Sequence, residues 1–108
     1  MIDRAAIREI VNLYVKHGWL LRRVLLSAST KQSLKSASDL FGDIPVIDSD
    51  IDAAWFSRPP VGGGVAWEIR NLSASPYALL ANIDEYDSGF QDALNAVEAQ
   101  LRIASYAN

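Results

Sequence analysis

Hydrophobic side chains recur at three- and four-residue intervals near both ends of the chain. The first such stretch covers about residues 4–17, and its apolar positions are Ile7, Ile10, Val11, Tyr14 and Val15. The second covers about residues 89–106, and its apolar positions are Phe90, Ala93, Leu94, Val97, Leu101 and Ala104. Because this spacing gathers apolar side chains on one face of a helix, we expect an amphipathic helix at each end. Asp3 is the expected N-terminal cap of the first helix, and Gly18 its C-terminal turn residue.

Two shorter elements are expected after the first helix. Residues 19–26 are apolar on both sides of an extended chain, which favours a short strand buried on two faces. A helix is expected next, over about residues 31–41, capped by Ser29 or Thr30 and followed by Gly42. Its inward-facing side chains would be Leu34, Ala37 and Phe41.

Residues 43–56 have the least usual pattern in the chain. In an extended conformation, side chains alternate between the two faces of a strand. One face would carry the apolar side chains Ile47, Ile51, Ala53 and Trp55, and the other would carry Asp48, Asp50 and Asp52. We therefore expect a strand here, and Pro45 favours either its start or a place at the edge of a sheet.

The pattern of residues 65–83 predicts a β-hairpin. Residues 65–72 alternate regularly, residues 77–83 form a second apolar run, and turn-forming residues lie between them. The full order of elements is then α-β-α-β-β-β-α, without regular βαβ repetition. We expect an α+β fold, a mixed α/β two-layer sandwich in which about three helices cover mainly one face of a sheet of roughly three to five strands.

Length and composition narrow the class of protein. With 108 residues, half of them hydrophobic, the chain suits one domain over residues 1–108, with one hydrophobic core. The absence of cysteine excludes disulfide scaffolds, thiol catalysis and cysteine-ligated metal sites. The charged opening does not resemble an export signal, and no apolar stretch approaches the ~20 residues of a membrane span. We therefore expect a soluble, cytoplasmic protein without a membrane partner.

The formal net charge of −3 conceals an uneven distribution. Residues 1–38 carry seven basic and two acidic side chains, a net charge of +5, whereas residues 39–108 carry three basic and eleven acidic side chains, a net charge of −8. The two parts attract each other, within one fold or between two copies. An anionic partner would need the basic side chains to share a surface, and the pI of about 4.9 argues against nucleic acid.

The run Asp48, Asp50 and Asp52 is the first candidate site. Alternate acids resemble the opening of a calcium loop, but the glycine and glutamate that such a loop needs further on are replaced by Ala53 and Pro59. Three interpretations remain open. The acids form a solvated face that resists edge-to-edge pairing, pair with the basic N-terminal part, or bind a divalent cation of unknown identity.

Aromatic and arginine side chains on both sides of a glycine-rich loop form the second candidate site. Trp55 and Arg58 precede the loop, and Trp67 and Arg70 follow it. This combination suits a binding pocket or a protein interface. The alternative is that both tryptophans are core residues and the loop is a long connection.

The sequence contains no recognisable catalytic set. The single histidine, His17, lies where the first helix is expected to end, so we expect a structural role for it. Acid–base chemistry through Glu68 or Asp84 stays open, although no spacing indicates a pair. No cofactor motif is present, so we expect no cofactor.

We therefore expect a non-catalytic protein-interaction or oligomerisation domain, acting as a homo-oligomer or with a protein partner. The high apolar fraction and the aromatic-rich segments favour this function. The alternative is an enzyme that binds a small ligand or a divalent metal through Asp48, Asp50 and Asp52 together with Arg58.

Overall fold

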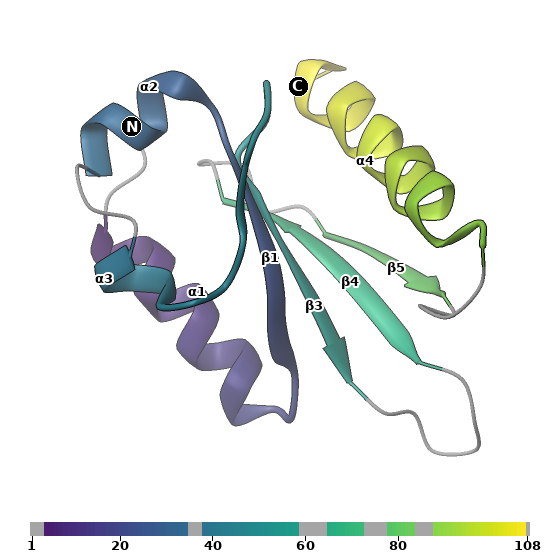
Figure 1. The fold of residues 1–108 in the computed structure, drawn as a ribbon, viewed down its shortest axis with the longest axis horizontal. Helices are drawn as coiled ribbons and strands as arrows, with labels where there is room; N and C mark the ends of the chain where they lie inside the picture. The colour runs from purple at the N-terminus through teal and green to yellow at the C-terminus, as the bar shows by residue number, and fades with distance from the viewer. Residues whose placement is uncertain (1–3, 35–37, 59–64, 73–77, 84–87, 108) are drawn as a thin grey trace.

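Five strands form one mixed sheet, and helices lie against both of its faces (Figure 1). The computed structural model describes residues 4–34, 38–58, 65–72, 78–83 and 88–107. In chain order the elements are α1 (Arg4–Lys16), β1 (Leu20–Leu26), α2 (Ala28–Leu34), α3 (Ser38–Phe41), β2 (Val46–Asp48), β3 (Ala53–Arg58), β4 (Ala66–Asn71), β5 (Ala78–Asn82) and α4 (Phe90–Ala107). The α+β class is confirmed, and the order of elements matches the prediction apart from one additional strand and a division of the second helix.

The strands lie in the order β2-β1-β3-β4-β5, so β2 and β5 are the edges of the sheet. Only β1 and β2 run parallel, and the other neighbours are antiparallel. The predicted hairpin is the pair β4–β5, in which Glu68 lies opposite Leu80. Its turn lies outside the described residues. Pro45 directly precedes the edge strand β2, as predicted.

The strand expected over residues 43–56 is two strands, so this prediction is wrong. β2 pairs with one side of β1 in parallel, and β3 pairs with the other side of β1 antiparallel. The chain must therefore reverse and cross from one side of β1 to the other between Asp48 and Ala53. The carboxylate of Asp52 holds this crossing in place, because its Oδ1 accepts a hydrogen bond of 2.7 Å from the backbone N–H of Ser27 at the end of β1.

The expectation that helices cover mainly one face of the sheet is also wrong. Strand β3 is apolar on both faces: Ala54 and Phe56 lie in the core on the α1 side, whereas Ala53 and Trp55 lie in the core on the α4 side. A strand of this kind needs cover on both sides to remove its apolar surface from water. The fold therefore has three layers, with α1, α2 and α3 on one side and α4 on the other (Figure 1).

Helix α1 matches its predicted range and turns into β1 through Gly18. The backbone of Gly18 has φ 88°, a left-handed conformation that glycine adopts without steric cost. The N–H of Trp19 then donates to the carbonyl oxygen of Tyr14 at 3.0 Å, which folds the chain back under the helix. Val15, expected on the buried face, is exposed. Asp3 lies outside the described residues.

The second predicted helix begins earlier than expected. Ser27, rather than Ser29 or Thr30, caps α2, because its Oγ accepts a hydrogen bond from the N–H of Thr30 at 3.4 Å. Leu34 in α2 and Phe41 in α3 are buried as predicted, and Gly42 follows α3 with φ 59°. Ala37 is not among the described residues.

No described helix combines the length and the apolar character that a membrane span requires.

Candidate functional site

The structure gives the three aspartates of the first candidate site three different partners. Asp48 pairs with Lys31 of α2, with 2.7 Å between Oδ1 and Nζ. Asp50 pairs with Arg102 of α4, with 2.7 Å between Oδ1 and Nε, and this hydrogen bond lowers the pKa of the Asp50 carboxyl. Asp52 binds Ser27 through both the backbone N–H and the hydroxyl group.

These partners keep the acidic side chains apart. Within the described part of the chain, no three acidic or histidine side chains are grouped closely enough to hold a metal ion. Arg58, which the enzyme hypothesis places beside the aspartates, is the last residue of β3, whereas Asp52 directly precedes the first. The length of β3 therefore separates Arg58 from the acidic segment.

The two tryptophans of the second candidate site lie in the core on the α4 side. Trp55 is 0% exposed and Trp67 is 1% exposed, and their rings meet edge to face with 6.1 Å between centroids. The indole N–H of Trp55 donates to Oε2 of Glu98 on α4 at 2.8 Å. The indole nitrogen of Trp67 has no hydrogen-bond partner among the described residues. The glycine-rich loop between the two tryptophans is outside the described residues.

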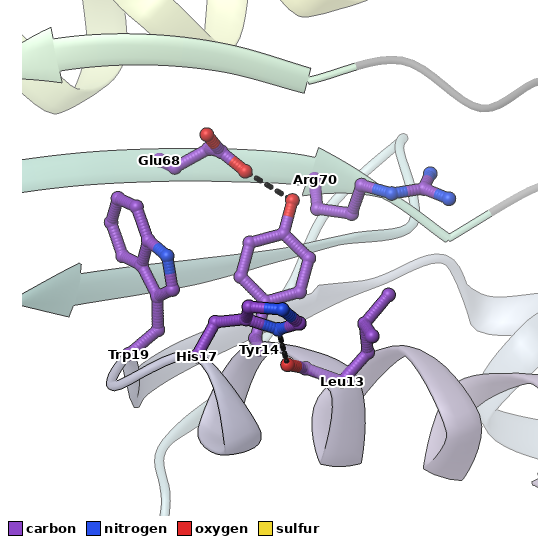
Figure 2. A pocket seen from close by; sticks show the side chains of 6 residues that line it. All are labelled: Leu13, Tyr14, His17, Trp19, Glu68 and Arg70. Atoms are coloured by element: carbon purple, nitrogen blue, oxygen red, sulfur yellow. Dashed lines mark hydrogen bonds between the residues drawn. The ribbon is translucent and has the colours of Figure 1, made fainter.

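Arg70 lies on the opposite face of β4 from Trp67 and lines a groove between α1 and β4 (Figure 2). This α1–β4 groove has a volume of about 290 Å³. Its described lining consists of Leu13, Tyr14, His17, Trp19, Glu68 and Arg70. Of the seven residues predicted for binding, Arg70 lines the groove and Arg58 contacts its wall through Trp19.

The groove forms because the two helical layers cover different parts of the sheet. Helix α1 packs against β1, whereas α4 packs against β4 and β5. Along β4, Trp67 and Ile69 point into the α4 layer, so the alternating residues Glu68 and Arg70 point to the α1 side. Next to Glu68 on β5, Leu80 is 68% exposed. At Leu80, therefore, the α1 side of β5 is largely exposed.

Tyr14 connects the helix to the base of the groove. Its ring stacks on Phe56 of β3 with 4.1 Å between centroids, and its hydroxyl donates a hydrogen bond to Oε2 of Glu68. Burial and this hydrogen bond raise the pKa of the Tyr14 hydroxyl well above its usual range. The phenol therefore stays protonated at neutral pH and holds the Glu68 carboxylate in one orientation.

Trp19 forms another wall of the groove and is held from two sides. Its ring meets Tyr14 edge to face at 6.0 Å, and the guanidinium of Arg58 lies 4.6 Å from its centroid. Arg58 also donates a hydrogen bond to the carbonyl oxygen of His17 at 3.4 Å. These contacts connect the wall of the groove to the turn between α1 and β1 and to the end of β3.

His17 and Leu13 form the outer rim of the groove on α1. The ring nitrogen Nδ1 of His17 donates to the carbonyl oxygen of Leu13 at 2.8 Å, which fixes the exposed imidazole at the C-terminus of the helix. The structural role of His17 stays a prediction, and the ring also lines the groove. Leu13 is 55% exposed although it is a large apolar side chain.

Sequence reasoning considered His17 and Glu68 separately and missed Leu13, Tyr14 and Trp19 as site residues. Tyr14 fitted the buried stripe of a helix, and Trp19 fitted a buried strand, so neither pattern suggested this groove. The available signal was Leu13, an apolar residue that lies off the buried stripe of α1.

No protein-family model, curated protein or solved structure matches this chain.

Proposed function

We propose that the protein is a non-catalytic interaction module, and that a segment of a partner protein docks in the α1–β4 groove. The observation that carries this proposal is the composition of the groove: aromatic and apolar walls surround the polar anchor groups of Glu68 and His17. Interfaces concentrate their binding energy in such aromatic pockets with few polar groups.

The compartment that we propose for this protein is the cytoplasm, as the sequence predicts.

The size of the groove favours a side chain over a larger ligand. Its volume of about 290 Å³ is at or below the range of about 300–1,000 Å³ that small-molecule sites occupy. Exposed Leu13 on one side and exposed Leu80 beyond Glu68 extend the apolar surface past the groove itself. One side chain of a partner fits the groove, and its neighbours along the partner chain would contact this extended surface.

The chemistry of Tyr14 supports binding rather than catalysis. A general acid or base works best with a pKa near the working pH. The pKa of the Tyr14 hydroxyl is raised away from that range. The hydroxyl keeps its proton and uses it in the hydrogen bond to Glu68. The pair therefore acts as a fixed anchor.

A random peptide library displayed on phage, selected against the immobilised protein, tests this proposal. We expect selected peptides to bind the wild type and to lose binding to the variant Leu13→Asp, which places a charge in the apolar wall. The matched control is Ile103→Asp, because Ile103 on α4 is also an exposed apolar helix residue, 70% exposed against 55% for Leu13. Peptides that bind both variants equally, or a library without enriched binders, would overturn the proposal.

Strand β5 favours self-association as a second candidate function. It is an edge strand of five residues that contains no charged residue and no proline. Natural edge strands use charged residues and proline to prevent pairing with other strands, and β5 lacks both. Its Leu80 is also exposed. Light scattering over a range of concentrations distinguishes the cases. A dimer that Leu80→Lys dissociates supports pairing through β5, and a monomer at every concentration excludes it.

A further inference from the structure

The carboxylate of Glu68 has an uncommitted oxygen inside the α1–β4 groove. Its Oε2 accepts the hydrogen bond from Tyr14, and the described residues supply no second hydrogen bond and no ion pair to this side chain. Glu68 is only partly accessible to water. A carboxylate in such a position gains from an oppositely charged partner, because the surrounding protein weakens its hydration.

The nearest cation on the same strand does not fill this role. Arg70 follows Glu68 by two residues on the same face of β4, but its guanidinium donates to the carbonyl oxygen of Asn71. Figure 2 shows the Arg70 side chain extending along the strand, away from the Glu68 carboxylate. The guanidinium of Arg70 is therefore turned away from the Glu68 carboxylate, while its charge still acts on the Tyr14 hydroxyl and lowers the pKa of that group.

The walls beside Glu68 suit a long side chain that ends in a cation. The ring of Tyr14 and the ring of Trp19 flank the carboxylate, and aromatic rings attract cations. The chain already uses this contact at the margin of the groove, where the guanidinium of Arg58 lies over Trp19. The exposed Leu13 offers an apolar surface for methylene groups.

We propose that the α1–β4 groove receives a basic side chain of the partner protein, whose charged group pairs with Glu68. This inference rests on the proposed function and adds the chemistry of the partner to it. The occupant passes its methylene groups over Leu13, stacks against Tyr14 and donates to the free oxygen of Glu68. Charge complementarity selects a basic side chain over apolar ones of similar size, since only a cation neutralises the carboxylate.

Titration of the ¹⁵N-labelled protein with blocked tripeptides tests this inference by NMR. The probes are acetyl-Gly-Arg-Gly-amide, its neutral isostere with citrulline, and acetyl-Gly-Glu-Gly-amide. We expect the arginine peptide to shift the amides of His17, Glu68 and Arg70, and to bind about tenfold more tightly than the citrulline peptide. Tighter binding of the glutamate peptide would overturn the inference, because it would show that the arginines at the margins dominate.

Variants of the anchor locate the effect. Glu68→Gln keeps the shape of the side chain and removes its charge, so we expect about tenfold weaker binding of the arginine peptide and no change for citrulline. Tyr14→Phe keeps the charge of the carboxylate but removes the hydroxyl that orients it, so the arginine peptide should bind this variant more weakly than the wild type and more tightly than Glu68→Gln. Asp92→Asn, an exposed acid on α4, is the matched control and should leave binding unchanged.

The peptides selected from the library separate the failure of this inference from the failure of the proposed function. Library peptides that lose binding to Leu13→Asp but bind wild type and Glu68→Gln equally would overturn the basic side chain and leave the docking groove standing. If neither library peptides nor the arginine tripeptide shift residues of the groove, both proposals fall.

Discussion

The hydroxyl of Tyr14 on α1 donates a hydrogen bond to Oε2 of Glu68 on β4, across 54 residues of sequence. The ring of Tyr14 is fixed at the same time by its stacking on Phe56. The carboxylate therefore has a defined orientation before any partner arrives. A preorganised anchor loses less conformational entropy on binding, which increases the affinity gained from each contact.

The Tyr14–Glu68 hydrogen bond should contribute measurably to stability. Tyr14→Phe leaves the partly buried carboxylate without its donor, so we expect a loss of about 1–2 kcal/mol in the free energy of unfolding, measured with urea. Glu68→Gln retains an acceptor for the hydroxyl and should cost less. A Tyr14→Phe variant as stable as the wild type would show that the bond contributes nothing.

Tyr14 should also make the fold sensitive to alkaline pH. Its pKa is raised in the folded protein, whereas in the unfolded chain it returns to about 10. Below pH ~10 both states are protonated and the stability is fully present, and above it only the unfolded chain ionises. We therefore expect the free energy of unfolding to fall as pH rises above ~10, less steeply in Tyr14→Phe. Parallel pH profiles for the two proteins would contradict this expectation.

The two buried tryptophans should respond differently to the same substitution. Trp55 donates to the buried carboxylate of Glu98, whereas the indole nitrogen of Trp67 lacks a partner among the described residues. Trp55→Phe leaves the Glu98 carboxylate without its hydrogen-bond donor, whereas Trp67→Phe removes a donor that has no acceptor among the described residues. We expect Trp55→Phe to cost about 2 kcal/mol more in the free energy of unfolding. Equal losses would mean that the hydrogen bond to Glu98 is not what distinguishes the two sites.

Replacing each of the three aspartates by alanine should lower the free energy of unfolding by different amounts. Asp52→Ala removes the hydrogen bonds to Ser27 at the crossing between β2 and β3. It should lower the free energy of unfolding, measured by thermal unfolding, by about 2 kcal/mol. Asp48→Ala and Asp50→Ala break exposed ion pairs and should each change stability by about 0.5 kcal/mol or less. Three equal losses, or a rise in melting temperature with Mg²⁺ or Ca²⁺, would point instead to a shared cation site.

Most elements of the fold could be predicted because their signals are local. The spacing of apolar residues in α1 and α4, the left-handed turn at Gly18 and the alternation from Ala66 to Asn71 each depend on neighbouring residues only. The division of residues 43–56 into two strands could not be predicted in this way. It depends on both strands pairing with β1, and the alternating aspartates imitate one continuous strand.

The candidate site could be predicted only in fragments for the same reason. Glu68 stood out as a titratable group and Tyr14 as a helix residue, but their contact depends on where α1 lies over the sheet. The aromatic and arginine residues of the second candidate site are close in sequence, but the fold places them on opposite faces of the sheet. Trp55 and Trp67 face α4, while Arg70 faces the groove.

Intermolecular NOEs between isotope-labelled protein and unlabelled acetyl-Gly-Arg-Gly-amide test the central claim most directly. If the α1–β4 groove receives a basic side chain, the methylene protons of the peptide arginine will show NOEs to the ring protons of Tyr14 and to the methyl groups of Leu13. The same sample prepared with Glu68→Gln will show weaker contacts or none. NOEs confined to other surfaces of the protein, or unchanged in the Glu68→Gln sample, would contradict the claim.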